Sequence, residues 1–591
     1  SVVAALEAAG AREKDLGVAK QVVDQVVGRL PRVFDGHTTP SSIDVREMVN
    51  ATFIDHNLVH ASKKYSSYRF EARHESQAAR YGHGITVKRY FTTAGKHPYE
   101  LINWQKRTAK ITNEKGETVF EQTDVDVPDF WSQTATNIVV QKYFRGKVGG
   151  ADRETSARQL IDRVAITMSN WGRKDGYFQT AEDAQIYEHE LTHILINQMA
   201  AFNSPVWFNV GVSPHPQCSA CFINSVQDDM RSILHLCMTE GMIFKGGSGS
   251  GINLSPLRSS KEFLGGSNGR SSGPLSFMKG LDAFAGVIKS GGKTRRAAKM
   301  VILNIDHPDI EAFIKCKAEE EKKAWALMDA GYDGSIDGPA YSSIFFQNAN
   351  NSVCVTDEFI QAVRDDGEFS THEITTGKPS VKYKARELMD MIGEAAWQCG
   401  DPGMQYDTTV NKWHTCKNTD RIHASNPCSE YMFLNDTACN LSSLNLMRFR
   451  KQVGDKMEFD VESFAAAARV VITAMEISVG NSSYPTPAIE QNSHDYRPLG
   501  IGYANLGALL MSRGMAYDSD EARNFAAAIT SLLSGVCYDQ SALIADKVGA
   551  FNGFKLNAEP CMEVMRMHRD ASYQVADLGV PADLQTAHRK A

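Results

Sequence analysis

Apolar residues recur at helical spacing through the first part of the chain and in two long segments near its end. Residues 1–70 have this spacing on both sides of a stretch rich in Pro and Gly, and residues 155–202 predict two helices that end near Ala201. Ala-rich patterns over 461–480 and 519–548 predict long helices. Residues 71–150 are mixed, and ITNEKGETVFEQ predicts a hairpin around Lys115 and Gly116.

Short apolar runs, glycine-rich turns and helical patterns alternate between about 201 and 450, which is typical of an α/β domain. KMVILNID predicts a strand and ARELMDMIGEAAWQC a helix, whereas the acidic, glycine-containing segment 329–343 predicts a surface loop. We therefore predict three regions, namely helices in 1–70, a mixed and helical part in 71–200, and an α/β domain in 201–591.

Charge and cysteine content narrow the functional classes. The net charge of the 591 residues is −7, so no broad basic field favours nucleic acid or an anionic membrane. Eleven scattered cysteines argue against a secreted disulfide scaffold and predict a reducing, cytoplasmic compartment. No apolar run approaches the ~20 residues of a membrane-spanning helix. The first residues, SVVAALEAAGAREKD, resemble the interior of an amphipathic helix, so we expect further chain before them.

Two short motifs suggest metal or redox chemistry. HELTH matches the His-Glu-x-x-His zinc pattern through His189, Glu190 and His193, but no carboxylate follows at the distance of a third ligand, and an ordinary helix face is favoured. CSAC places Cys218 and Cys221 three positions apart, yet no second CxxC completes a zinc site. We therefore assign no metal site. One cysteine of this pair can still act with a distant partner.

Two glycine-containing segments suggest phosphate binding. KGGSGSGINLSPLRSS, residues 245–260, is dense in glycine at its start and contains Arg258 near its end. It is neither a Walker A loop nor a dinucleotide fingerprint. SGGKTRRAAKM, residues 290–300, places Lys293, Arg295, Arg296 and Lys299 beside glycines. A flexible turn and a solvated basic turn are the alternatives.

NPCSE, residues 426–430, combines an amide, a thiol and a carboxylate at alternate positions. In an extended segment Asn426, Cys428 and Glu430 would lie on one face and converge on one small substrate. A nucleophilic cysteine needs a neighbouring base such as histidine, and a nearby carboxylate opposes thiolate formation. The pattern favours hydrogen-atom chemistry at the thiol, with the carboxylate as base and the amide as clamp. The alternative is a buried strand end with incidental polar residues.

Ten ordered blocks from about residue 90 onward resemble adenosylcobalamin-dependent (class II) ribonucleotide reductases. Pro after Asn in NPCSE is similar to class II enzymes, whereas class I catalytic subunits usually have Leu. The resemblance implies a ten-stranded α/β barrel after helical N-terminal regions, and residues 1–70 resemble the later part of an ATP-cone. The blocks are HPYELINW, PDFWSQTATNIV, KYFRG, NSPVWFNVG, SACFIN, FKGGSGSGINLSPLRSS, GGKTRRAAKMVILNIDHPDIEAFI, NANNSV, SNPCSEYMFLNDTACNLSSLNL and YRPLGIGYANLGALLM.

The resemblance implies a role for each catalytic residue. Cys428 would carry the thiyl radical that takes the 3′ hydrogen of the substrate, Glu430 would accept the 3′-hydroxyl proton, and Asn426 would bind the ribose hydroxyls. Cys221 and Cys439 would reduce the substrate as its 2′-hydroxyl leaves as water, and would end as a disulfide. Cys218 is not part of the family pattern.

The resemblance also implies cofactor, ligands and partners. Adenosylcobalamin would supply the radical, because ordinary side chains do not generate one. Ribonucleotides, as diphosphates, would be the substrates, deoxynucleotides and ATP the effectors, and a thioredoxin-type protein the reductant. Substrate would be held by Ser204, Ser248 and Gly249. The effector would be held by Asp228 and Arg258 together with Lys293, Arg295 and Arg296 of the 291–299 loop.

The chain departs from the family at its end. The Pro-Thr-Gly-Thr phosphate segment and the C-terminal cysteine pair of the family are absent before AHRKA. We therefore expect a part of a longer or divided enzyme that turns over poorly alone, completed by a further chain segment or partner or working as a homodimer. Two alternatives are a class I-type subunit that uses a radical-generating metalloprotein, and an inactive nucleotide-binding half of a split reductase.

Overall fold

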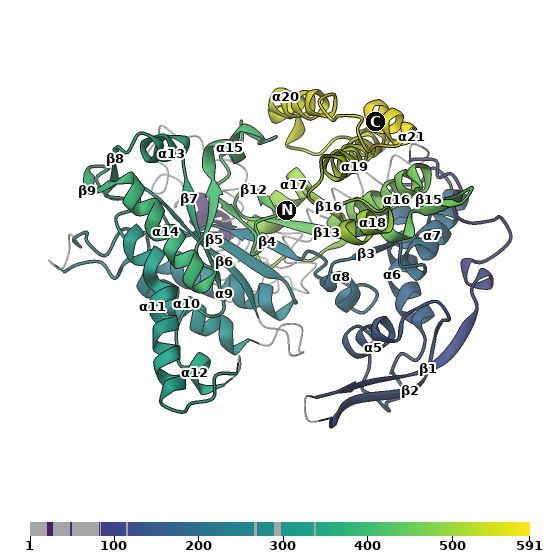
Figure 1. The fold of residues 1–591 in the computed structure, drawn as a ribbon, viewed down its shortest axis with the longest axis horizontal. Coiled ribbons are helices and arrows are strands. Elements are labelled where there is room, and N and C mark those ends of the chain that lie inside the picture. Colours follow the sequence, from purple (N-terminus) through teal and green to yellow (C-terminus); the bar gives the residue numbers. More distant parts are fainter. Residues whose placement is uncertain are drawn as a thin grey trace. The chain divides into compact units, whose positions relative to one another are not determined.

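The computed structural model describes residues 20–27, 48–49, 52, 82, 84–113, 116–264, 269–288, 297–335 and 338–591 (Figure 1). Most of the helical region predicted for 1–70 lies outside them, as do Lys293, Arg295 and Arg296. The chain forms two compact units, Ser1–Thr86 with Gly172–Ala181 and Val87–Trp171 with Glu182–Ala591. In the first unit, residues 20–27 are helical and Ile85 pairs with Phe178 in a parallel bridge.

The second unit is built on an eight-stranded mixed sheet, which confirms the predicted α/β class. Five strands are parallel, in the order β10, β7, β6, β5, β4. β13 is antiparallel to β4 and β3, and parallel to β16. The predicted count of ten strands is not reached in the described part of the chain. The strands are β3 (Ala200–Phe202), β4 (Cys221–Asn224), β5 (Gly249–Asn253), β6 (Ala298–Asn304), β7 (Asn350–Val355), β10 (Gly403–Tyr406), β13 (Thr437–Asn445) and β16 (Leu499–Ala504).

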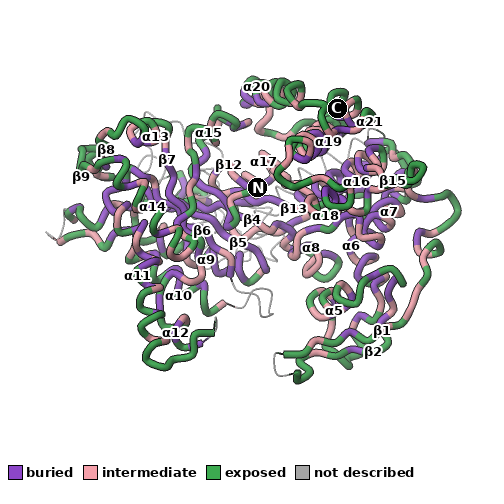
Figure 2. Tube along the Cα trace, viewed as in Figure 1, coloured by how far each residue is buried: buried purple, intermediate pink, exposed green. Residues whose placement is uncertain are grey.

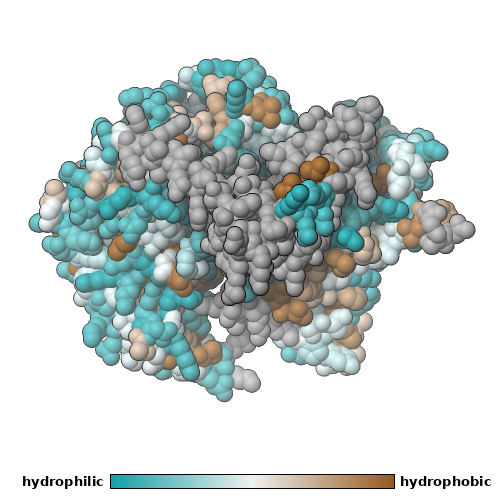
Figure 3. All heavy atoms as spheres, turned by 180° about the vertical axis from the view of Figure 1, so that it is seen from behind, coloured by the Kyte–Doolittle hydropathy of each residue, from teal (hydrophilic) through white to brown (hydrophobic). Residues whose placement is uncertain are grey.

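The core lies between this sheet and the helices that connect its parallel strands. Residues of β4 and β5 are buried along both strands, because each is covered on its two faces, as parallel strands usually are (Figure 2). Among the described residues visible in Figure 3, hydrophilic ones predominate and apolar ones form small separate groups. The helices between the parallel strands are α9 (Met230–Lys245), α10 (Gly273–Val287), α11 (Ile310–Asp329), α12 (Pro339–Ser342), α13 (Asp357–Arg364) and α14 (Ala385–Cys399).

Several elements confirm the periodicity analysis. The predicted helix ARELMDMIGEAAWQC is α14, and the predicted strand KMVILNID contains β6. The hairpin predicted around Gly116 joins β1 (Trp104–Thr112) to β2 (Thr118–Pro128). The two helices predicted in 155–202 are α6 (Ala157–Lys174) and α7 (Ala181–Ile196), but the second ends before Ala201, which belongs to β3.

The two long Ala-rich patterns form α16 (Val461–Asn481) and α19 (Asp520–Val548), which pack against each other. Among the described residues α16 alone is long and apolar enough to span a membrane, and 67% of its apolar window is buried, as in a core helix. The remaining elements are η2 (Pro98–Leu101), α5 (Gln133–Lys142), α8 (Ser204–Asn209), β8 (Glu368–His372), β9 (Pro379–Lys384), α15 (Asp407–Lys412), β11 (Ala424–Ser425), β12 (Met432–Phe433), η3 (Leu446–Arg448), β14 (Arg450–Val453), β15 (Lys456–Phe459), α17 (Pro487–Tyr496), α18 (Leu506–Ser512), α20 (Phe554–Ser572) and α21 (Ala582–Lys590).

Candidate active site

The segment NPCSE is a turn rather than an extended strand, so the predicted single face of Asn426, Cys428 and Glu430 is wrong. The turn joins β11 and β12, which pair antiparallel. The Asn426 N–H donates to the Tyr431 carbonyl at 3.0 Å, and the Ser429 N–H donates to the Asn426 carbonyl at 3.2 Å. Ser429 adopts a left-handed φ of 64°, which breaks the alternation of an extended chain.

The turn divides its three functional groups between interior and surface. Asn426 is 1% exposed, whereas Cys428 and Glu430 are exposed. The buried carboxamide is bonded at both ends, since its oxygen accepts from the Tyr431 N–H at 3.0 Å and its nitrogen donates one N–H to the Cys221 sulfur at 3.0 Å. The exposed thiol of Cys428 is accessible from solvent and belongs to no disulfide.

Cys221 and Cys439 lie directly opposite each other on the antiparallel strands β4 and β13. Opposed residues of such a pair have Cα atoms about 4.5–5.5 Å apart, within the range of about 4.4–6.8 Å that a disulfide needs. Both cysteines are thiols in this structure, and both are buried, with 5% and 0% exposure. The fold thus brings Cys221 and Cys439, which are far apart in the sequence, to a spacing from which a disulfide bond can form.

Burial determines the protonation of this thiol pair. It raises the pKa of Cys221 well above the usual value, and the neighbouring Cys439 and Glu430 raise it further. Burial likewise raises the pKa of Cys439, with Glu430 adding to the effect. The Cys221 thiol also donates to the Glu430 carboxylate, with 3.5 Å between Sγ and Oε1. Both thiols therefore keep their protons near neutral pH.

Two glycines of β5 allow the turn to lie directly on the sheet. A Cβ on Gly251 would lie 1.6 Å from the Ser425 carbonyl oxygen, and one on Gly249 would lie 2.6 Å from the Pro427 side chain. The intervening Ser250 lies at the next position of the same strand, and its hydroxyl donates to Glu240 of α9. The alternation Gly-Ser-Gly thus brings backbone without side chains to the turn, a packing role that the sequence analysis did not predict.

The predicted substrate residues have different surroundings. The Ser204 hydroxyl lies 3.1 Å from the Tyr143 hydroxyl. Ser248 is 3% exposed, donates to the Ser219 carbonyl at 2.6 Å and accepts from Gln217 Nε2 at 2.6 Å, so its hydroxyl is already engaged. Sequence reasoning missed Tyr143 and Gln217, since isolated polar residues give no signal of their partners.

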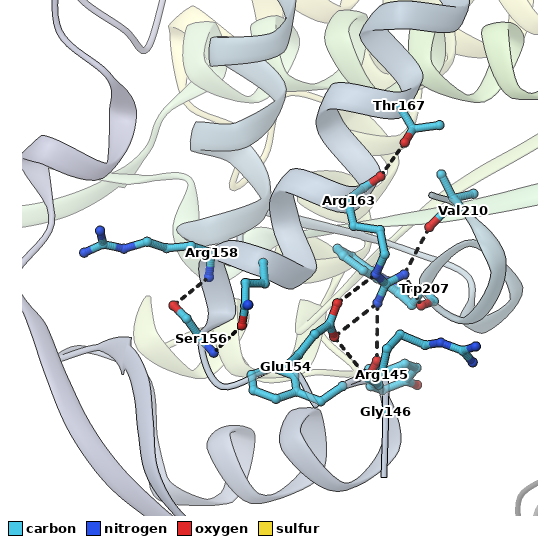
Figure 4. A network of polar contacts seen from close by, with 12 residues as sticks. Arg145, Gly146, Glu154, Ser156, Arg158, Arg163, Thr167, Trp207 and Val210 are labelled. Atoms are coloured by element: carbon cyan, nitrogen blue, oxygen red, sulfur yellow. Dashed lines mark hydrogen bonds and ion pairs between the residues drawn. The ribbon is translucent and has the colours of Figure 1, made fainter. Parts of the chain in front are cut away.

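A buried ion pair of Arg163 and Glu154 lies beside the end of helix α8 (Figure 4). Arg163 of α6 binds Glu154 with Nε and Oε1 2.9 Å apart. The same guanidinium donates to the carbonyls of Trp207 and Val210 at 2.9 and 3.1 Å, which satisfies groups at the end of α8. Arg163 therefore ties helix α8, which begins at Ser204, to α6.

The predicted effector residues Asp228 and Arg258 contact each other. Arg258 Nε lies 2.5 Å from Asp228 Oδ2, and the Arg258 N–H donates to Oδ1 at 3.2 Å. Lys299, grouped with the basic loop by sequence, is instead buried at 2% exposure. Its Nζ lies 2.5 Å from Glu240 Oε2 in α9. Lys299 is therefore a structural cation, and its interpretation as a phosphate-facing residue is wrong.

The HELTH motif has a structural role. Glu190 is fully buried, and its carboxylate accepts from the backbone N–H groups of Phe91 and Thr92 and from the Thr92 hydroxyl. No cluster of three or more His, Cys, Asp or Glu suited to a metal ion occurs in the described ranges. Cys218 is buried, and its thiol donates to the Pro216 carbonyl with 3.6 Å between sulfur and oxygen.

Two family models match the chain. The model described as "Ribonucleotide reductase, barrel domain" covers residues 219–575, and "Class II vitamin B12-dependent ribonucleotide reductase" covers residues 105–198. The chain belongs to the class II ribonucleotide reductase family. This match favours class II over the class I-type alternative. Class II membership implies a cobalamin cofactor, which is adenosylcobalamin in this class.

Curated relatives agree with this assignment. The chain is 53% identical over 503 residues, 84% of its length, to the vitamin B12-dependent ribonucleotide reductase of Streptomyces avermitilis, and covers 52% of that protein. It is 51% identical over 528 residues, 84% of its length, to the enzyme of that name from Rhodopirellula baltica, covering 50% of it. The chain thus spans about half the length of these relatives. A relative from Mycobacterium tuberculosis, 29% identical over 72% of this chain and 56% of its own, is named a ribonucleoside-diphosphate reductase.

The cofactor class fits the geometry of the turn. Cys428 is exposed while Cys221 and Cys439 are buried, so of these three thiols only Cys428 can be reached by a bulky group from solvent. The residues that would lie against such a group are those of the exposed part of the turn, Cys428 to Glu430. The arrangement thus separates one thiol that is accessible from solvent from two thiols inside the fold.

Proposed function

We propose that this protein reduces ribonucleoside diphosphates to 2′-deoxyribonucleoside diphosphates, with a thiyl radical on Cys428. The observation that carries the proposal is the placement of Cys221 and Cys439 opposite each other on β4 and β13. They lie beside the turn that carries a third, exposed thiol. One thiol for initiation and two for reduction are the groups that this chemistry requires.

The atoms balance with these residues alone. The Cys428 sulfur takes the 3′ hydrogen atom of the ribose, and Glu430 accepts the 3′-hydroxyl proton. The 2′-hydroxyl leaves as water with a proton from one thiol of the pair, and the other thiol gives its hydrogen atom to C2′ as the disulfide forms. The remaining electron of the pair reduces the C3′ carbonyl while Glu430 returns its proton to O3′, and Cys428 then returns a hydrogen atom to C3′. In sum, the ribonucleotide and two thiols give the deoxyribonucleotide, one disulfide and water. When bound, adenosylcobalamin supplies the one-electron chemistry that removes the hydrogen atom from the Cys428 thiol.

The surroundings of the pair support its role as a source of protons and electrons. Burial raises the pKa of both thiols, so each enters the reaction with its proton. The Asn426 amide binds the Cys221 sulfur, and in our proposal it also binds the ribose hydroxyls once substrate enters. Ser204, Ser248 and Gly249 belong to the proposed substrate site; Ser248, already engaged, contributes through the backbone of its glycine segment.

The proposal also covers the phosphorylation state of the substrate, the effectors, the reductant and the location in the cell. The name of the Mycobacterium tuberculosis relative supports diphosphates over triphosphates. The Asp228–Arg258 ion pair is proposed as the place where a deoxynucleotide or ATP competes for Arg258, with Lys293, Arg295 and Arg296 completing that site. A thioredoxin-type protein would reduce the Cys221–Cys439 disulfide. Eleven thiols without a disulfide support a cytoplasmic location.

A single-turnover assay tests the function without an external reductant. Reduced, desalted protein is mixed anaerobically with adenosylcobalamin and CDP or CTP, and deoxynucleotide is quantified per chain. We expect up to one dCDP per chain, less dCTP, and a new disulfide between Cys221 and Cys439 in peptide maps. Cys428→Ala should form neither product nor disulfide.

Two outcomes would overturn the proposal. Equal product from Cys428→Ala would remove the radical role of that thiol. Nucleotide binding without any deoxynucleotide would favour the nucleotide-binding half of a split reductase, and adding the C-terminal half of a relative would then be the deciding step.

A further inference from the structure

Both ends of the NPCSE turn contact the same sulfur atom. Asn426, the first residue of the turn, donates its side-chain N–H to Cys221 Sγ at 3.0 Å. Glu430, the last residue, accepts the Cys221 thiol proton at 3.5 Å. Asn426 also closes the turn, because its side-chain oxygen accepts from the Tyr431 N–H at 3.0 Å. One thiol thus holds the two ends of the segment that presents Cys428.

We propose that reduced Cys221 is a positioning residue for Cys428, and that forming the Cys221–Cys439 disulfide releases the turn. Cys428 is then held in its reacting position only while the two reducing thiols are available. The consequence for turnover rests on the function proposed above. The contacts themselves do not depend on it.

The chemistry of disulfide formation explains the release. Two thiols lose two protons and two electrons, which the substrate accepts as its C2′–O bond breaks and water leaves. The oxidised Cys221 sulfur has no proton to donate to Glu430. It must also lie about 2.05 Å from the Cys439 sulfur, and we expect it to leave its contact with Asn426 when it takes this position. Both ends of the turn therefore lose their contact in one step.

Other contacts keep the turn seated when this happens. Asn350 Nδ2 donates to the Pro427 carbonyl at 2.8 Å, and Gln405 Nε2 donates to the hydroxyls of Ser425 and Ser429 at 2.8 and 3.1 Å. None of these groups contains a redox-active atom. The expected change is therefore a local loosening of the turn around Cys428, with β11 and β12 still paired.

Amide hydrogen exchange measures this loosening without turnover. The N–H groups of Asn426, Ser429 and Tyr431 are all hydrogen-bonded within the turn. Exchange of the peptide covering 424–433 is followed by mass spectrometry after reduction with dithiothreitol, and after oxidation with diamide. Diamide takes up the two protons and two electrons of the pair, and a peptide map verifies the 221–439 disulfide. We expect about tenfold faster exchange after oxidation, or about 1.4 kcal/mol, as expected for one or two lost hydrogen bonds.

Two alanine variants form a matched pair. Neither Cys221→Ala nor Cys439→Ala can form the disulfide, but only the first removes the contacts to the turn. Cys221→Ala should exchange fast under both conditions, and Cys439→Ala should exchange slowly under both. Equal exchange of the two variants, or of the oxidised and reduced protein, would overturn the proposal. Because no nucleotide or cofactor is present, a failure of deoxynucleotide synthesis would leave this result unchanged.

Discussion

Replacing Lys299 by methionine should strongly destabilise the protein. The side chains of Lys299 and Glu240 are 0% and 1% exposed, with Nζ and Oε2 2.5 Å apart. Methionine fills a similar volume but leaves the Glu240 carboxylate buried, with the Ser250 hydroxyl, at 2.9 Å, as its one remaining donor among the described residues. Removing one partner of a buried ion pair costs about 3–5 kcal/mol of the free energy of unfolding, because a charge remains without compensation.

Equilibrium urea denaturation measures the effect through the shift of the midpoint at a common slope. The double variant Glu240→Gln, Lys299→Met removes both charges and keeps an acceptor for Ser250, so it should recover most of the lost stability. Lys315→Met is the matched surface control. Its pair with Glu311 is 42% exposed on both sides and should contribute less than about 1 kcal/mol. A Lys299→Met protein as stable as this control would refute the reasoning.

Three further outcomes are expected. Arg163→Lys should lose about 1.5–3 kcal/mol in urea denaturation, because an ammonium cannot replace the guanidinium fork on Glu154 and two carbonyls; unchanged stability would contradict this role. Burial alone would raise the pKa of Glu262, but the hydrogen bonds to its carboxylate outweigh burial and lower that pKa. The unmodified protein should therefore be more stable than Glu262→Gln at pH 7, and this difference in the free energy of unfolding should shrink as the pH falls below about 4.3. At pH 8, iodoacetamide should alkylate the exposed Cys428 before the buried Cys439, because burial raises the pKa of Cys439. Peptide mapping measures the order, and alkylation of Cys439 before Cys428 would contradict this prediction.

Local patterns predicted the elements, since helix and strand periodicity depend on neighbouring residues. The helix Ala385–Cys399 and the strand containing Met300 to Leu303 were found in this way. NPCSE was misjudged because its conformation depends on distant residues. β11 and β12 contain two residues each, too few to show a periodicity, and the glycines of β5 that make room for the turn lie far away in the sequence.

The side-chain partners of the site residues could not be predicted from the sequence either. Lys299 stands in a basic run, and nothing in that run indicates that Glu240 of another element neutralises it. Cys221 and Cys439 were paired through a family resemblance, and the opposition of β4 and β13 now supports that pairing. A register between strands separated by more than two hundred positions cannot be read from either segment alone.

The close approach at Gly251 also limits how the site can vary. The turn carrying Cys428 rests on main-chain atoms of β5, and any side chain at Gly251 would occupy the space of the Ser425 carbonyl. Rotamer changes cannot adjust a contact between two backbones. Randomised libraries that aim to alter substrate choice should therefore keep Gly249 and Gly251 fixed and vary positions that act through their side chains, such as Tyr143 or Gln217.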